Sequence, residues 1–170
     1  AVGDDTPARP TRSSNTNTMD IDSSVVMVSE HGQKLDTIYY GQKRSNCGSI
    51  IHAGDDLTGN DKKGVYDNEE IKINLTTIPS NVKSLKFIAN VYQGQSRGHD
   101  FGQVKGAYIR VLQTSNRDEL IRYNLSEDYN GMRGIIVGEL YRHNNEWKFR
   151  VIGQGTPSDS LTELVQVVIN

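Results

Sequence analysis

The sequence is poor in cysteine and in long apolar runs. Cys47 is the only cysteine among 170 residues. One thiol can form neither an intrachain disulfide nor a multi-cysteine metal site, and this usage fits a reducing compartment. The apolar stretches are only a few residues long, and the opening AVGDDTPARP has no hydrophobic core. We therefore expect neither a transmembrane segment nor a signal peptide, and we expect a cytoplasmic protein.

An excess of one charge is also missing. The chain has 19 Lys and Arg residues against 21 Asp and Glu residues, a formal net charge of -2. The basic residues occur as scattered pairs rather than as a stripe, which argues against a nucleic-acid partner. Hydrophobic residues make up 35% of the chain. This share is low for a single globular domain and indicates a large fraction of polar loops.

Short segments with apolar alternation or β-branched residues follow one another along most of the chain, each closed by Gly, Asn, Asp or Pro. This pattern predicts strands. Residues 1–18 have no large hydrophobe after Val2, so we expect a disordered tail there and a domain over residues 19–170. The nine expected strands are Ser24–Ser29, Thr37–Tyr40, Ser49–His52, Glu70–Leu75, Ser84–Gln93, Tyr108–Gln113, Leu120–Asn124, Ile135–His143 and Trp147–Gly153.

The connections indicate antiparallel pairing. Asn144 and Asn145, in RHNNEW, predict a tight hairpin because asparagine tolerates positive φ. Only SDSLTELVQVV, near the C-terminus, has a helical apolar period, with Ser158 or Ser160 as its cap. Without alternating strands and helices, the expected fold is all-β: an antiparallel β-sandwich with long acidic loops and one short C-terminal helix.

Residues 50–73, IIHAGDDLTGNDKKGVYDNEEIKI, form an unusually acidic connection, with Asp55, Asp56, Asp61, Asp67 and Glu69. Asp20 and Asp22 lie two residues apart before the first strand, so on an extended chain they project to one side. Carboxylates on bendable, glycine-containing loops suit calcium, which takes six to eight oxygen ligands. The spacing does not fit an EF-hand, because Asp61 stands where that loop needs glycine and the flanks are expected strands.

Several long motifs resemble the tellurium-resistance, TerD-type, family: MDIDSSVVM, CGSIIHAGDDLTG, DNEEIKINLTTIPSNVKSLKFIANVYQGQSRGHDFGQVKGAYIRV, ELIRYNLSED and IIVGELYRHNNEWKFRVIGQG. The resemblance runs from about Asp20 to Gly155. It implies a calcium-binding β-sandwich of the bacterial cytoplasm that acts in stress response and tellurite resistance. It also implies partners among other tellurium-resistance proteins at the membrane surface.

The resemblance places one or two calcium ions on the acidic motifs. The implied ligands, which include backbone carbonyls of the GDDLTG loop, are Asp20, Asp22, Asp55, Asp56, Leu57, Gly59, Asp67, Asn68 and Glu69. The family's GDDE motif is altered, with Tyr66 in place of Gly and Asn68 in place of Asp. Asn68 keeps an oxygen ligand but brings no charge, so we expect one site to be weaker.

Two other functions compete with a simple calcium module. GQSRG, residues 94–98, matches a nucleophile-elbow pattern, and Ser96, Asp128 and His143 follow the hydrolase order. The residues after Ser96 show no helical period, which that elbow requires, so we do not expect an enzyme. The second alternative is a sandwich in which calcium organises a site for a small ligand such as a nucleotide or a sugar.

Overall fold

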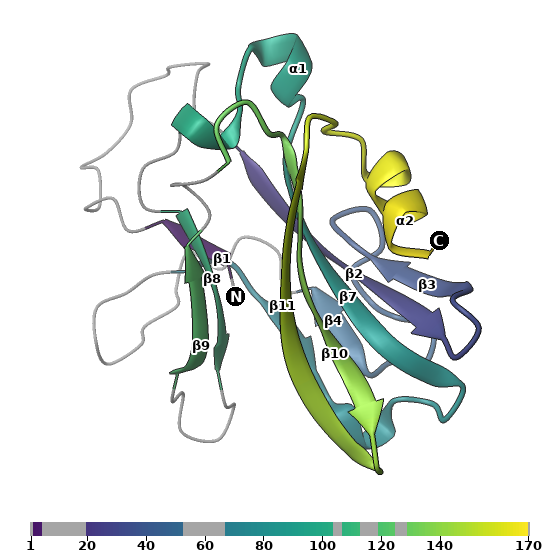
Figure 1. Cartoon of the computed structure of the whole chain (residues 1–170). Coiled ribbons are helices and arrows are strands. Elements are labelled where there is room, and N and C mark those ends of the chain that lie inside the picture. Colours follow the sequence, from purple (N-terminus) through teal and green to yellow (C-terminus); the bar gives the residue numbers. More distant parts are fainter. Residues whose placement is uncertain are drawn as a thin grey trace.

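The four longest strands of the described residues belong to a five-stranded antiparallel sheet, shown in Figure 1. In the computed structural model, residues 2–4, 20–52, 67–103, 107–112, 119–124 and 129–169 are described. The sheet has the order β11-β10-β7-β2-β3. Its strands are β2 (Ile21–Ser29), β3 (Lys34–Ile38), β7 (Val82–Val91), β10 (Gly134–His143) and β11 (Glu146–Thr156).

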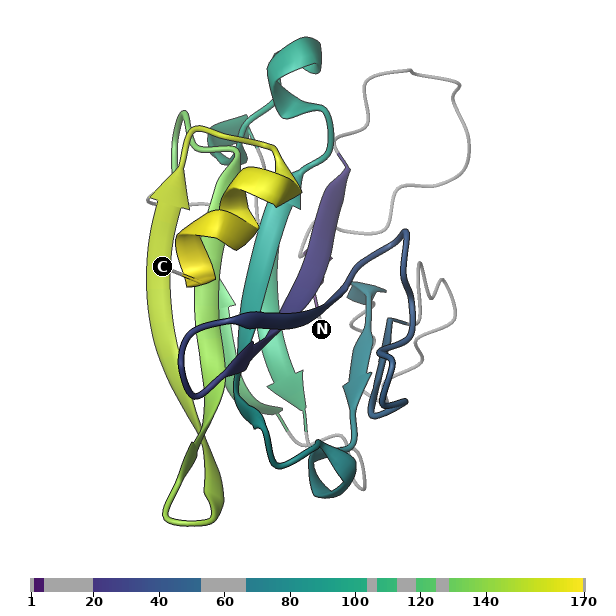
Figure 2. The ribbon, with the colours of Figure 1, turned by 90° about the vertical axis from the view of Figure 1, so that its right-hand side faces the viewer.

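Both faces of this sheet are covered, and the alternation along β2 shows how. Val25 and Met27 face a core cluster on one side, whereas Val26 and Val28 pack with Leu164 on the other. Leu164 belongs to α2 (Leu161–Ile169), which crosses the outer face of the sheet in Figure 2. Burial on both faces explains why SSVVMV reads as a continuous buried run rather than as a half-exposed strand.

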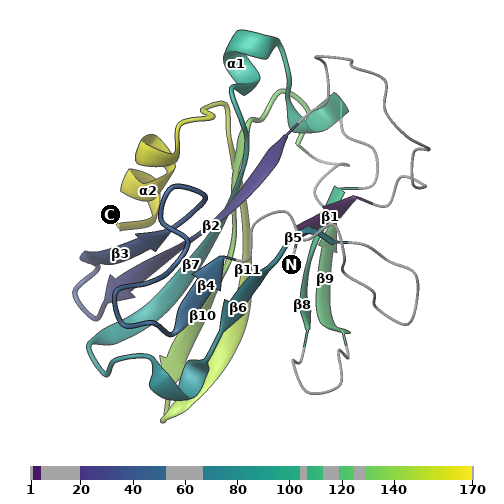
Figure 3. The same ribbon diagram turned by 180° about the vertical axis from the view of Figure 1, so that it is seen from behind.

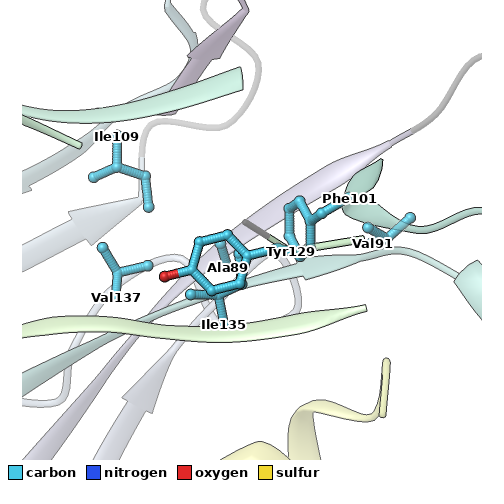
Figure 4. Close-up of a cluster of buried hydrophobic side chains, with 7 residues drawn as sticks. All are labelled: Ala89, Val91, Phe101, Ile109, Tyr129, Ile135 and Val137. Atoms are coloured by element: carbon cyan, nitrogen blue, oxygen red, sulfur yellow. The ribbon is translucent and has the colours of Figure 1, made fainter. Parts of the chain in front are cut away.

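The inner face packs against a second layer. This layer contains a four-stranded sheet, β5-β1-β8-β9, and a two-stranded one, β4-β6 (Figure 3). Figure 4 shows the core cluster in which Ile109 of β8 meets Val137 of β10. The bounds of the smaller strands are β1 (Val2–Asp4), β4 (Ile50–His52), β5 (Asp67–Glu69), β6 (Ile71–Ile73), β8 (Ala107–Leu112) and β9 (Glu119–Asn124).

The expected antiparallel β-sandwich is confirmed, and each of the nine expected strands has a counterpart with shifted ends. The hairpin of β10 and β11 turns through Asn144 (φ 50°) and Asn145 (φ 64°), as predicted. The C-terminal helix is α2, and the backbone N–H of Glu163 donates to Oγ of Ser160, the cap residue. None of the helices in the described residues has the length and apolar character needed to cross a membrane.

Three features differ from the expectation. Val2–Asp4, placed in the expected tail, form β1 and pair with β5 and β8. The rest of that tail lies outside the described residues. Asp67–Glu69 form the extra strand β5, and Gly94–Arg97 form a one-turn helix, α1. Two short 3-10 segments also occur, at Leu75–Thr77 and at Phe101–Gln103.

Candidate functional site

Asp22 occupies the beginning of β2 on the outer face of the long sheet. It is 7% exposed and lies opposite Asn90 of β7 in the antiparallel register. Residues directly opposite each other in such a pair point their side chains to the same face. Asp22 therefore shares a face with Val26 and with α2. Asp20 precedes the strand and is exposed, and its carbonyl oxygen accepts the backbone N–H of Tyr92 at 2.8 Å.

The start of β2 has an open flank. Strand β3 pairs only with Val25–Val28, so no strand of the described residues pairs with the first four residues of β2 on that side. His52, at the end of β4, reaches across this flank, and its Nε2 hydrogen-bonds to the carbonyl oxygen of Ser23 at 3.2 Å. His52 is 2% exposed, so this contact is a fixed internal one.

His52 also marks where the acidic connection begins. Its register partner is Ile71 of β6, so the chain enters and leaves residues 53–70 at two neighbouring positions. His52, at the first of these positions, contacts Ser23, the residue that follows Asp22. The structure therefore ties the start of the acidic connection to the strand that carries the other acidic motif.

The remaining expected ligands are only partly described. Asp55, Asp56, Leu57 and Gly59 lie outside the described residues. The backbone of Asp67–Glu69 forms β5, with Asp67 opposite Gly3 and Glu69 opposite Val2 of β1. Within the described part of the chain, no three His, Cys, Asp or Glu side chains are grouped closely enough to hold a metal ion.

A hollow of about 590 Å³ opens beside Asp22 on the outer face. Its floor includes the side chains of Asp22, Ser24 and Asn90, and residues of α1 and of the start of α2 surround it. The side chains of this floor offer a carboxylate, a hydroxyl and an amide carbonyl oxygen, and oxygen atoms are the ligands of a hard cation such as calcium. The residues present at this end of β2 thus fit a calcium ion in chemical type.

Asn90, on the floor of the hollow, has a buried amide oxygen without a partner among the described residues. It is 5% exposed, and its Nδ2 donates to the carbonyl oxygen of Asp159 at 3.2 Å. Its Oδ1 is buried and has no hydrogen-bond partner among the described residues. A buried amide oxygen without a partner costs about 1–3 kcal/mol, so it marks a position where an external donor or cation is favoured.

Two tyrosines form one wall of the hollow. The rings of Tyr40 and Tyr92 meet edge to face, with centroids 6.1 Å apart, and Tyr40 is 53% exposed. Partial burial raises the pKa of Tyr40, and Tyr92 and the Asp22 carboxylate raise it further.

Asn90, Tyr40 and Asp159 were not among the expected site residues. They come from β7, from the segment after β3 and from the approach to α2. A polar residue inside the apolar run FIANVY was the one visible signal for Asn90. Its neighbours become apparent only when the register of β2 and β7 is known.

The residues of the hydrolase alternative do not assemble. Ser96 lies in α1, where its hydroxyl donates to the carbonyl oxygen of Gln93 at 3.1 Å. α1 follows the end of β7 that pairs with Gly134, whereas His143 ends β10 at the far hairpin, as Figure 1 shows. Ten residues of strand separate these two ends, a distance of about 30 Å. Asp128 lies outside the described residues.

The family model of the TerD domain matches residues 6–167. The chain belongs to the TerD domain family. It is 40% identical over 150 residues to the stress response protein SCP2 of Bacillus subtilis. That match covers 86% of this chain and 73% of SCP2. It is 38% identical over 162 residues to the tellurium resistance protein TerD of Serratia marcescens, covering 94% and 83% of the two chains.

Two solved structures share the fold of this TerD-domain chain. One is a homologue of the telluride resistance protein TerD, SCO6318 from Streptomyces coelicolor, with a TM-score of 0.71 and 18% identity over 98% of this chain and 94% of the other. The second is SAV2460, a protein of unknown function, with a TM-score of 0.73 and 21% identity over 95% and 90% of the two chains. At these identities the likeness concerns the fold alone.

Proposed function

We propose that this TerD-domain protein is a cytoplasmic, non-enzymatic calcium-binding module of the stress and tellurite response. One or two ions are held by Asp22 together with Asp55, Asp56, Asp67 and Glu69. Asp20, Asn68 and the backbone carbonyls of Leu57 and Gly59 are further ligands. The observation that carries the proposal is the contact between His52 and Ser23. It ties the start of the acidic connection to the strand of Asp22.

The names of its relatives support the wider role. They include tellurium resistance proteins of Serratia marcescens and stress proteins of Bacillus subtilis. We propose that this chain acts with other tellurium-resistance proteins at the membrane surface. Calcium binding would regulate that association, because closing the acidic connection onto β2 changes the surface that a partner meets.

Calorimetric titration of chelator-treated protein tests the calcium proposal. Calcium is expected to bind with measurable heat, and magnesium more weakly, since its small octahedral shell fits a loose cage of carboxylates poorly. Asp22→Asn should weaken calcium binding at least tenfold. Glu30→Gln, an exposed carboxylate just past the other end of β2, is the matched control and should change nothing. Absence of calcium heat at millimolar concentration in the wild type refutes the proposal.

Thermal unfolding gives a second readout. An ion that binds only the folded arrangement adds about 2.7 kcal/mol of stability at a hundred times its dissociation constant.

If two ions bind, the site that contains Asn68 should fill at higher calcium concentration than the other. Asn68→Asp should narrow that gap, because it restores a charge. A single binding step that Asn68→Asp leaves unchanged contradicts the assignment of the weaker site.

A second candidate function is the binding of a small ligand beside the calcium site. The hollow next to Asp22 favours it, because its volume of about 590 Å³ falls within the usual range for small-molecule sites. The proposed ligand is a nucleotide or a sugar.

A further inference from the structure

We propose that the hollow between β2, β7 and the start of α2 binds a neutral, hydroxyl-rich ligand, namely a sugar unit or a related polyol. This inference deepens the second candidate function and does not depend on calcium. The residues that carry it are Asn90, Tyr92, Tyr40 and Asp159, which lie outside the acidic motifs, together with Asp22.

The floor of the hollow requires a ligand with hydrogen-bond donors. The amide of Asn90 has a defined orientation, because turning it over would place its oxygen against the carbonyl oxygen of Asp159 instead of the Nδ2 donor. Its Oδ1 therefore stays an acceptor, and it is buried with no partner among the described residues. The carboxylate of Asp22 lies at the opposite register position, so a second acceptor stands on the same face. Two adjacent acceptors suit a pair of hydroxyl groups.

The wall of the hollow requires a flat, weakly polar surface on the ligand. Tyr40 and Tyr92 lie beside the polar floor, and Tyr40, which is half exposed, offers the more open ring because Arg97 stacks on Tyr92. The C–H face of a sugar ring is slightly positive and packs on the negative face of an aromatic ring. A ligand that combines such a face with outward hydroxyl groups satisfies the wall and the floor together.

The charges around the hollow disfavour an anionic ligand, and Arg97 disfavours an organic cation. Asp22 and Asp159 both line it, so a phosphate or a carboxylate entering there meets two negative charges. This argues against a nucleotide. The guanidinium of Arg97 stacks on the ring of Tyr92, with its central carbon 5.6 Å from the ring centroid. That position on the ring is the one an organic cation would take, and the Arg97 guanidinium already occupies it. This argues against an organic cation and leaves a neutral organic ligand.

The rim is held in a defined shape. Asp159 Oδ2 accepts the backbone N–H of Gln95 at 2.9 Å, which ties α1 to the segment before α2. Gln93, at the edge of the hollow, has φ 49°, a left-handed conformation that residues other than glycine rarely adopt. Such strained residues concentrate at ligand sites. The hollow is thus a preformed site rather than a gap that side chains would close.

The test is a titration of isotope-labelled protein, followed by amide chemical shifts, with and without calcium. The probes are methyl glucoside, methyl galactoside and myo-inositol as neutral polyols, adenosine monophosphate as an anion and putrescine as a cation. At least one neutral probe should shift the amides of residues 92–96 and Asp159. Asn90→Val should weaken that binding about tenfold, the contribution of one good hydrogen bond. Asn81→Ala, an exposed asparagine before β7, should leave the affinity unchanged.

Each remaining outcome overturns the proposal. These outcomes are no shift with any neutral probe up to high millimolar concentration, tighter binding of the anion or the cation at the same residues, or equal affinity in Asn90→Val and wild type. If Asn90→Val fails to fold, Tyr40→Ala replaces it, since Tyr40 is half exposed at the wall and its loss should also weaken binding about tenfold. The calcium titration above uses a different probe and a different readout, so failure of one proposal can be told from failure of the other although both involve Asp22.

Discussion

Removing the charge of Glu139 should destabilise the protein near neutral pH and have less effect in acid. Glu139 is 3% exposed on the outer face of β10. In the sheet it lies opposite Lys86 of β7 on one side and Arg150 of β11 on the other. Nζ of Lys86 is 2.5 Å from Oε2, and Arg150 donates to Oε1. Burial raises the pKa of Glu139, but the hydrogen bonds and charges of Lys86 and Arg150 lower it below its usual value overall.

The magnitude follows from the exposure of the two cations. Deleting one partner of a fully buried ion pair costs about 3–5 kcal/mol, because the other charge is left without compensation. The side chain of Lys86 is 20% exposed and that of Arg150 is 62% exposed, so both can turn toward water. We therefore expect Glu139→Gln to lower the free energy of unfolding by about 1–2 kcal/mol at pH 7.

The pH dependence has a definite sign. A carboxyl group whose folded pKa is lowered stabilises the protein above its unfolded pKa, which is about 4.3 for glutamate. That stability is lost as the pH falls through the folded pKa. The difference between wild type and Glu139→Gln should be constant from pH 6 to 7 and shrink below about pH 4.

Urea unfolding followed by the fluorescence of Trp147, the single tryptophan, measures this difference at each pH. Glu146→Gln is the matched control, because Glu146 is exposed at the start of β11. It should stay within about 0.5 kcal/mol of wild type. The reasoning is refuted if Glu139→Gln costs as much at pH 3 as at pH 7, or if it costs no more than the control.

Three further predictions concern other parts of the fold. Gly134→Ala should lower stability by about 1–3 kcal/mol in urea unfolding, because the added Cβ would lie 2.6 Å from Cδ2 of Leu164; an unchanged midpoint would contradict this packing. Ser96→Ala should leave the fold and calcium affinity intact, and a fluorophosphonate probe should not label the wild type; stoichiometric labelling at Ser96 would revive the hydrolase alternative. Burial raises the pKa of Cys47, but hydrogen bonds from Ser45 and Ser49 lower it below its usual value overall. The rate of iodoacetamide labelling should therefore reach half its maximum at a lower pH than for a free thiol, and Ser45→Ala should raise that pH. Equal pH midpoints in the two proteins would contradict this prediction.

Much of the fold is predictable because the long strands carry their own signal. β2 and β10 contain β-branched residues that pack on two faces, and asparagines mark the hairpin after β10. β1 and β5 have no such signal. Their sequences, VGD and DNE, contain mainly residues that disfavour strands, and they pair only because neighbouring strands offer free edges.

The candidate site likewise has one part that the sequence predicts and one part that it does not. Asp22 stands in an acidic motif that can be recognised along the chain. Asn90 and Asp159 reach the same hollow from positions far away in the sequence, and only the register of β2 with β7 and the position of α2 place them there. Such proximity has no local pattern, because it arises from tertiary packing.

The pairing of His52 with Ile71 has a consequence for the energetics of the acidic connection. The 18 residues between them, 53–70, form a loop whose ends must be brought together. The loss of chain entropy raises the free energy by a term of about 2.5 kcal/mol that depends on loop length, added to a term that does not. Folding of β4 and β6 against the core has already met this cost before any ion arrives. If the acidic connection binds calcium as proposed, substitutions that loosen β4 or β6, such as Ile50→Ala, should weaken that binding although they alter no proposed ligand. The apolar residues at the base of the acidic connection would then help to set its affinity for calcium.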